Sequence, residues 1–213
     1  TTPALIANIQ FSSRTRLNTK FFATIGDRNS VGFLKSVLIN DSINASTFQY
    51  NGRVVNIDQY RNYGMERRLL TEYKIGKAKH SLSAGIRLYT GNTFRRADGK
   101  GTTGTNYTVA VTGNYLKSIN FGSQNAAAFI ENVFRIGKRL LVIPGVRFEW
   151  LSGDAMGRNG YNASGDEILL QQIKRSRSFV LGGLGLEYHV SKSTEMYANY
   201  SQAYRPIQFA NLQ

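Results

Sequence analysis

Cysteine is absent from this sequence of 213 residues, histidine occurs twice and proline three times. Without cysteine, the chain has neither a disulfide framework nor a thiolate metal site. The two histidines, His80 and His189, lie far apart in the sequence, so neither a histidine-based metal site nor a histidine-driven catalytic triad is expected. We therefore expect a protein that is not an enzyme and that holds no metal or cofactor of its own.

Long apolar runs are also missing from the sequence. No stretch comes near the roughly 18 uninterrupted apolar residues that a transmembrane helix requires. The first residues, Thr1 to Ala4, lack the charged segment and the apolar core of a secretory signal. Any targeting signal is therefore expected to lie outside this sequence.

Runs of basic residues are short, although the net charge is +14. The longest clusters are pairs such as Arg67-Arg68 and Arg95-Arg96 and the spaced group at 174–177. The disordered basic arm typical of nucleic-acid binders is absent, and we expect no nucleic-acid partner. The charge favours lipopolysaccharide phosphate or an anionic small molecule as the partner instead.

Glycine (21 residues), tyrosine (12) and phenylalanine (12) are plentiful, and the aromatic residues suit β-strands. Eight segments carry apolar residues at alternate positions, which is the period of a strand with one apolar face. From Leu140 to Trp150 every even-numbered position is apolar, whereas Arg147 and Glu149 share the other face. The eight segments are 4–12, 18–28, 60–74, 80–90, 126–136, 140–150, 178–190 and 194–204. Each is long enough to cross a bilayer, which needs roughly 9–11 tilted residues per strand.

The connections between these segments alternate between short and long. Short turns are expected near 14–17, 76–79, 137–139 and 191–193, and long polar loops at about 29–59, 95–122 and 153–177. Bacterial outer-membrane barrels show this asymmetry, with short periplasmic turns and long extracellular loops. In soluble sandwiches the strands average about 5–6 residues, so the strand length also favours a membrane. The pattern predicts an all-β, antiparallel, up-and-down transmembrane β-barrel.

Two segments resemble the barrel of TonB-dependent transporters. The first reads Phe-Ile-Glu-Asn at 129–132, Gly-Lys at 137–138 and Pro-Gly-Val-Arg-Phe-Glu at 144–149, which is similar to a barrel hairpin of that family. The second reads Tyr-Ala-Asn-Tyr-Ser-Gln-Ala-Tyr-Arg-Pro at 197–206, with Ile207 where the family often has a second proline. The likeness is strong over 126–152 and 179–210 and weak before residue 60. Within the family it is greatest to receptors for ferric dicitrate or related ferric siderophores.

This resemblance implies a bacterial outer-membrane receptor that takes up a ferric chelate, with iron present only as part of the transported chelate. Transporters of the family have an N-terminal plug domain and a barrel of about 22 strands, and this chain shows neither the plug nor the other strands. We therefore expect residues 1–213 to form one partial barrel domain of about eight strands, with TonB acting through the missing plug region. A complete eight-stranded barrel with a structural or adhesion role is the alternative, although the sequence ends in Gln213 and not in an aromatic residue.

Charged residues within the strands are expected to face the lumen, because a charge in hydrocarbon costs free energy. Their role is either to line the transport path or to form ion pairs on a wet wall. The predicted lumen-lining residues are Arg87, Glu131, Arg135, Arg147, Glu149 and Glu187.

Basic residues of the long loops are candidates for capturing an anionic chelate through charge-assisted hydrogen bonds. Contact with lipopolysaccharide phosphate or plain solvation is the competing interpretation for each of them. The candidates are Arg95, Arg96, Lys100, Arg158, Lys174, Arg175 and Arg177.

Two further alternatives stay open from the sequence alone. A soluble basic β-protein could use its Tyr and Phe side chains as stacking platforms for nucleic acid or glycan. A hydrolase barrel could pair His189 with a luminal serine, although no spacing in the sequence supports this.

Overall fold

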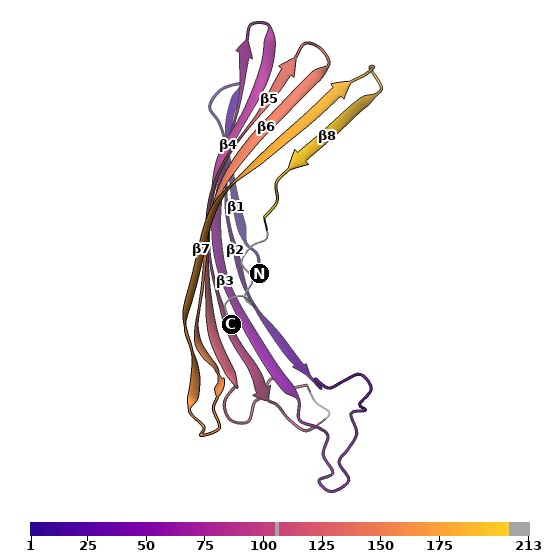
Figure 1. The fold of residues 1–213 in the computed structure, drawn as a ribbon, viewed down its shortest axis with the longest axis vertical. Helices are drawn as coiled ribbons and strands as arrows, with labels where there is room; N and C mark the ends of the chain where they lie inside the picture. The colour runs from indigo at the N-terminus through magenta and orange to yellow at the C-terminus, as the bar shows by residue number, and fades with distance from the viewer. Residues whose placement is uncertain (105–106, 205–213) are drawn as a thin grey trace.

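The structure is a computed structural model that describes residues 1–104 and 107–204, with the side chains of all of these except 171 and 172. The described residues form one antiparallel sheet of eight strands, which lie side by side in chain order (Figure 1). The strands are β1 (Ala4–Gln10), β2 (Thr15–Gly32), β3 (Val54–Ile75), β4 (Ala78–Lys100), β5 (Lys117–Ile136), β6 (Leu140–Tyr161), β7 (Glu167–His189) and β8 (Glu195–Ser201). The predicted all-β, antiparallel, up-and-down architecture is confirmed.

Short turns join the strands at one end of the sheet. Gly76 and Gly137 occupy two of these turns with φ angles of 60° and 64°, a left-handed conformation that glycine adopts without steric cost. The turn between β1 and β2 spans residues 11–14 and so precedes the predicted position at 14–17. No helix among the described residues has the length and apolar character needed to span a membrane.

The long-loop end of the sheet differs from the prediction. The connections there are 33–53, 101–116 and 162–166, so the predicted third long loop at 153–177 is wrong. Strands β6 and β7 run for 22 and 23 residues, about twice the length needed to cross a bilayer. Polar and apolar residues do not alternate regularly in their outer halves, so apolar alternation could not reveal them. Residues 162–166 form a tight turn in which the Asn162 side-chain oxygen accepts hydrogen bonds from the amides of Ser164 and Asp166.

The strand register separates the side chains into two faces of opposite character. Val180 lies opposite Phe148, which lies opposite Ala128, and this apolar row continues to Ile86 on β4, whose partner on β3 is the charged Arg67. The next row joins Leu181, Arg147, Phe129, Gly85 and Arg68. Apolar side chains on the face of Val180 are strongly exposed, with 62% of Val180 and 45% of Val146 accessible. No second sheet packs against them anywhere in the described part of the chain.

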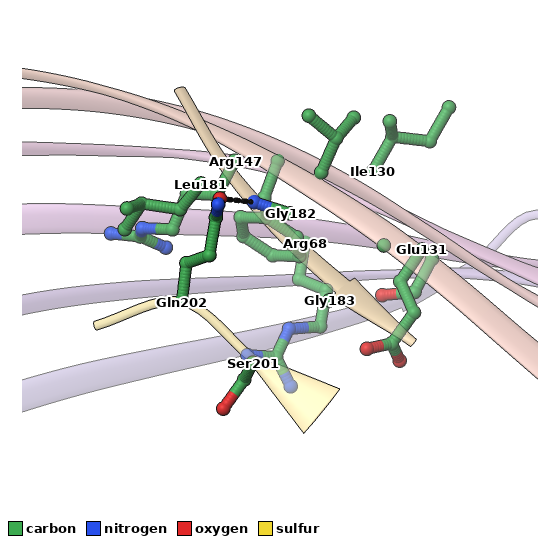
Figure 2. A pocket seen from close by; sticks show the side chains of 13 residues that line it. Arg68, Ile130, Glu131, Arg147, Leu181, Gly182, Gly183, Ser201 and Gln202 are labelled. Atoms are coloured by element: carbon green, nitrogen blue, oxygen red, sulfur yellow. Dashed lines mark hydrogen bonds between the residues drawn. The ribbon is translucent and has the colours of Figure 1, made fainter. Parts of the chain in front are cut away.

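The sheet bends along the strands into a curved wall (Figure 1). On its polar side one hollow is lined by residues from β1 to β5, and another by residues from β3 to β8. Ser201, at the end of β8, lies across the second hollow from Arg68 on β3, so the sheet curls toward its polar side (Figure 2). We call the two sides the concave face and the convex face below.

Candidate functional site

The middle of the concave face holds a hollow of about 490 Å³ (Figure 2). Charged side chains from three strands reach it: Arg68 from β3, Glu131 from β5 and Arg147 from β6. In Figure 2 the Ile130 side chain points to the opposite side of the strand from Glu131, as the alternation of a β-strand requires. The remaining lining residues include Ser83, Phe129, Leu181, Ser201 and Gln202.

Aromatic rings hold the guanidinium groups of this face in place. Phe129 lies between Arg68 and Arg147, whose guanidinium carbons are 5.4 Å and 5.8 Å from the ring centroid. Arg147 also donates a hydrogen bond to Glu149, whose other carboxylate oxygen accepts one from the Asn125 side chain at 2.6 Å. The arginines are therefore fixed by cation–π contacts as well as by ion pairs.

A second aromatic ring, that of Phe22, repeats this arrangement toward β2. Arg87 and Lys20 lie 5.8 Å and 5.7 Å from its centroid. The Nε atom of Arg87 is buried and has no hydrogen-bond partner among the described residues. Phe22 and Phe129 thus form two platforms that carry cations on the concave face.

Nearer the long-loop end, one carboxylate holds two arginines. Asp58 lies in register between Arg28 on β2 and Arg95 on β4. Its two oxygens are 2.7 Å from Nη2 of Arg28 and 2.8 Å from Nε of Arg95. Only 1% of the Asp58 side chain is accessible, whereas Arg28 is 63% exposed. Two cations against one anion leave a net positive charge with guanidinium donors that face the concave side.

Hydrophobic residues also support Arg95, in addition to its contact with Asp58. The guanidinium of Arg95 lies 5.7 Å from the ring centroid of Phe121. Phe121, Ile119 and Ala155 form a fully buried cluster, against which Leu170 and Ile173 pack. We name Arg28, Asp58 and Arg95 the arginine pair site, because the buried carboxylate binds both guanidinium groups and the cluster supports that of Arg95.

The prediction that seven basic residues lie in loops is wrong. All seven lie within strands, because the strands extend further than the apolar alternation: Arg95, Arg96 and Lys100 in β4, Arg158 in β6, and Lys174, Arg175 and Arg177 in β7. Of these, Arg95 belongs to the arginine pair site. Arg175 and Arg177 share the concave face with Leu181, whereas Lys174 shares the convex face with Val180.

Arg96 and Arg158 fasten the 101–116 loop instead of projecting freely. Arg96 lies 5.4 Å from the ring centroid of Tyr115. Arg158 donates hydrogen bonds to the carbonyl oxygens of Tyr115 and Leu116 and forms an ion pair with Glu167. These contacts give both arginines a structural role within the described residues.

All six residues predicted to face a lumen share the concave face. Arg87, Glu131 and Arg147 lie in its central rows, and Glu149 lies beside them on β6. Arg135 donates hydrogen bonds to the Lys79 carbonyl and the Ser81 hydroxyl, close to the short turns. Glu187 lies 2.8 Å from His189. Whether the six residues line a transport path stays a prediction.

Sequence reasoning missed Arg28, Asp58 and Arg68. Arg28 ended the predicted segment 18–28 and Asp58 fell in the predicted long loop at 29–59, and their contact depends on the β2–β3 register. For Arg68 a signal existed, since most charged residues of β3 stand, like Arg68, at even positions, with Arg61 and Arg67 as the exceptions. Arg205 and Pro206 of the second family-like segment lie outside the described residues.

Comparisons with known proteins agree with this geometry. A family model described as TonB dependent receptor-like, beta-barrel, matches residues 4–213, and the chain belongs to this family. No curated protein matches the chain by sequence.

Solved structures of similar fold include the unliganded ferric citrate transporter FecA, with a TM-score of 0.71 and 19% identity over 99% of this chain and 28% of that chain. The open form of the ferric-catecholate import receptor Fiu from E. coli K12 gives a TM-score of 0.69 and 13% identity over 96% of this chain and 35% of that chain. The closed form of Fiu gives a TM-score of 0.65 and 14% identity over 94% of this chain and 32% of that chain. At these identities the likeness shows the fold alone, and the chain spans about a third of the length of these proteins.

Proposed function

We propose that this chain is the central part of the barrel of a bacterial outer-membrane importer for an anionic ferric chelate, such as a siderophore or a ferric citrate complex. In this proposal residues 1–213 form one partial barrel domain. A plug domain, encoded elsewhere in the full-length protein, couples transport to TonB. The observation that carries the proposal is the one-layered wall of a TonB-dependent receptor family member, apolar on its convex face and basic on its concave face.

The convex face supports a membrane environment. Exposed apolar side chains on a single sheet are stable only if something other than water covers them, because burying them is worth about 25 cal/mol per Å². Lipid hydrocarbon fits, since most rows from Leu5 to Tyr200 carry exposed apolar side chains without a second layer, with Arg67 as a charged exception opposite Ile86. Lipopolysaccharide then surrounds the long-loop end, where exposed Lys174 on the convex face suits its phosphates.

The arginine pair site supports an anionic cargo. Arg28 and Arg95 are held by Asp58, so fewer side-chain rotamers are lost when they bind a ligand. Guanidinium groups match the carboxylate or catecholate oxygens of a ferric chelate through paired hydrogen bonds. The similar solved structures are those of a ferric citrate transporter and a ferric-catecholate import receptor, which is consistent with this class of ligand.

Transport and binding in the full-length protein test the proposal. Cells that express it should take up radiolabelled iron as a citrate or catecholate chelate only when TonB is present. The Arg28→Gln, Arg95→Gln double variant should bind the chelate at least about tenfold more weakly, a loss of about 1.4 kcal/mol. Lys77→Gln, in a short turn at the opposite end, is the matched control and should bind normally. Uptake without TonB, or equal binding by the double variant and the wild type, would refute it.

The closed eight-stranded barrel is less well supported. Such a barrel pairs its first strand with its last, whereas β1 pairs only with β2 and β8 only with β7 among the described residues. In our proposal the sheet is therefore part of a barrel with more than eight strands.

A further inference from the structure

Three side chains that can bind a metal ion meet at the base of the β7–β8 hairpin, at the short-turn end of the sheet. Glu187 and His189 are two residues apart on β7, so both side chains project from the concave face. Glu195 on β8 is the direct cross-strand neighbour of His189. The register of one hairpin therefore brings together residues that the sequence separates by a turn.

The ligand atoms of these residues converge. Nε2 of His189 lies 2.8 Å from Oε1 of Glu187, and Nδ1 lies 3.8 Å from Oε2 of Glu195. One ligand atom from each of the three residues can be chosen so that all lie within 4.8 Å of one another. Around a zinc ion, with bonds of roughly 2.0–2.2 Å, ligand atoms lie about 3–4 Å apart. The two carboxylates face different nitrogens of the ring, and one ion binds only one of them, so Glu195, whose side chain is 62% exposed, has to turn toward the Nε2 side to complete the site.

We propose that Glu187, His189 and Glu195 form a binding site for a divalent transition-metal ion such as Zn²⁺. One imidazole and two carboxylates are a donor set that suits zinc and its neighbours in the first transition row. An all-oxygen site would favour magnesium or calcium instead. Three protein ligands leave at least one coordination position for water.

The backbone around the site keeps His189 and Glu195 in position. The amide of His189 donates a hydrogen bond to the Arg139 carbonyl in the neighbouring β5–β6 turn, at 2.8 Å. The amide of Ser191 donates one to the Thr194 carbonyl, which closes the hairpin. A bound ion would link β7 to β8 across this hairpin, and β8 gains an anchor beyond its seven-residue ladder.

A proton competes with the metal ion for the same imidazole. In the described arrangement the ring lies between the carboxylates of Glu187 and Glu195, which face its two nitrogen atoms. Imidazole must be unprotonated to bind a metal ion, so metal affinity falls as the solution becomes acidic. The alternative to the metal site is therefore a purely ionic Glu–His–Glu cluster.

Metal titration of the full-length protein in detergent distinguishes these two cases and does not depend on transport. After removal of metal by a chelator, Zn²⁺ is titrated by calorimetry and Co²⁺ by its visible absorption. The wild type should bind one ion that His189→Gln and Glu195→Gln each lose or bind at least about tenfold more weakly. Glu72→Gln changes an exposed glutamate near the same end of β3 and should leave this binding unchanged.

Two variants are used so that a loss of metal binding caused by misfolding can be recognised. Glu195 is exposed on β8, so Glu195→Gln should keep the fold even if His189→Gln does not. The cobalt absorption should weaken toward acid pH in the wild type. A wild type without a bound ion, or equal binding by the wild type, His189→Gln and Glu195→Gln, would overturn the proposal and leave the ionic cluster.

Discussion

The ring of Phe129 lies directly over Gly85, its cross-strand neighbour on β4. A Cβ atom on Gly85 would stand 2.6 Å from Cζ of that ring and 2.5 Å from the carbonyl oxygen of Arg67. Phe22 covers Gly64 in the same way, with 2.3 Å between the added Cβ and Cζ of the ring. The two glycines therefore let the rings lie against the sheet, where they support Arg68, Arg147, Arg87 and Lys20.

Gly85→Ala should destabilise the protein by about 1–3 kcal/mol, the usual cost of an added methyl group in a tightly packed place. The ring could move aside, but the Arg67 carbonyl is part of the β3–β4 ladder and cannot. Gly182→Ala is the matched control, because its nearest neighbouring atom would be 3.7 Å away. Unfolding of the full-length protein by denaturant in lipid measures the difference. Equal stability of the two variants would contradict the close contact.

Asp58→Asn should lower the free energy of unfolding by about 1–3 kcal/mol, the cost of losing a hydrogen bond to charged groups. The two arginines reach water in part, so the loss stays below that of a fully buried ion pair. Asp27→Asn removes an ion pair to Arg61 in which both side chains are more than 40% exposed, and it should cost at most about 1 kcal/mol. Denaturant titrations of both variants, run side by side, measure the contrast. A smaller effect for Asp58 than for Asp27 would show that the carboxylate does not hold the arginines.

Arginine substitutions at Val180 and Leu181 should have unequal effects. Val180→Arg places a charge on the convex face, where lipid contact would cost about 2–4 kcal/mol near the middle of the bilayer. Leu181→Arg places the same charge on the concave face beside Arg147, where water solvates it. Folding yield into lipid vesicles and the free energy of unfolding there measure both. If Leu181→Arg proved the more harmful substitution, the assignment of the two faces would be reversed.

The apolar alternation predicted the parts of the strands that have one apolar face, and the parity of each segment put Arg147 and Glu131 on the same side. It could not predict where β6 and β7 end, because polar residues such as Ser152 and Ser176 interrupt the apolar face there, whereas the apolar Ala155 and Ile173 lie on the other face. Strand halves without one continuous apolar face carry no period-two signal. This is why Arg158 and Arg175 were assigned to a loop.

Contacts that depend on register were also beyond the sequence. Arg28, Asp58 and Arg95 come from three strands, and a shift of one residue in either pairing would separate them. The same holds for His189 and Glu195, whose neighbourhood follows from the length of the turn between β7 and β8. Sequence parity gives the face of a residue, whereas its partners are fixed only by the pairing of the strands.

The central claim is that alternate residues of each strand face lipid and water, and nitroxide scanning of β7 tests it most directly. Single cysteines placed from 179 to 186 in the full-length protein, in lipid bilayers, are labelled and their collisions with oxygen and with a water-soluble nickel chelate are measured. The even positions, including Val180, Leu184 and Leu186, should collide mainly with oxygen, and the odd positions, including Leu181, Gly183 and Gly185, mainly with nickel. Collision rates without a two-residue period, or with the opposite parity, would contradict the account.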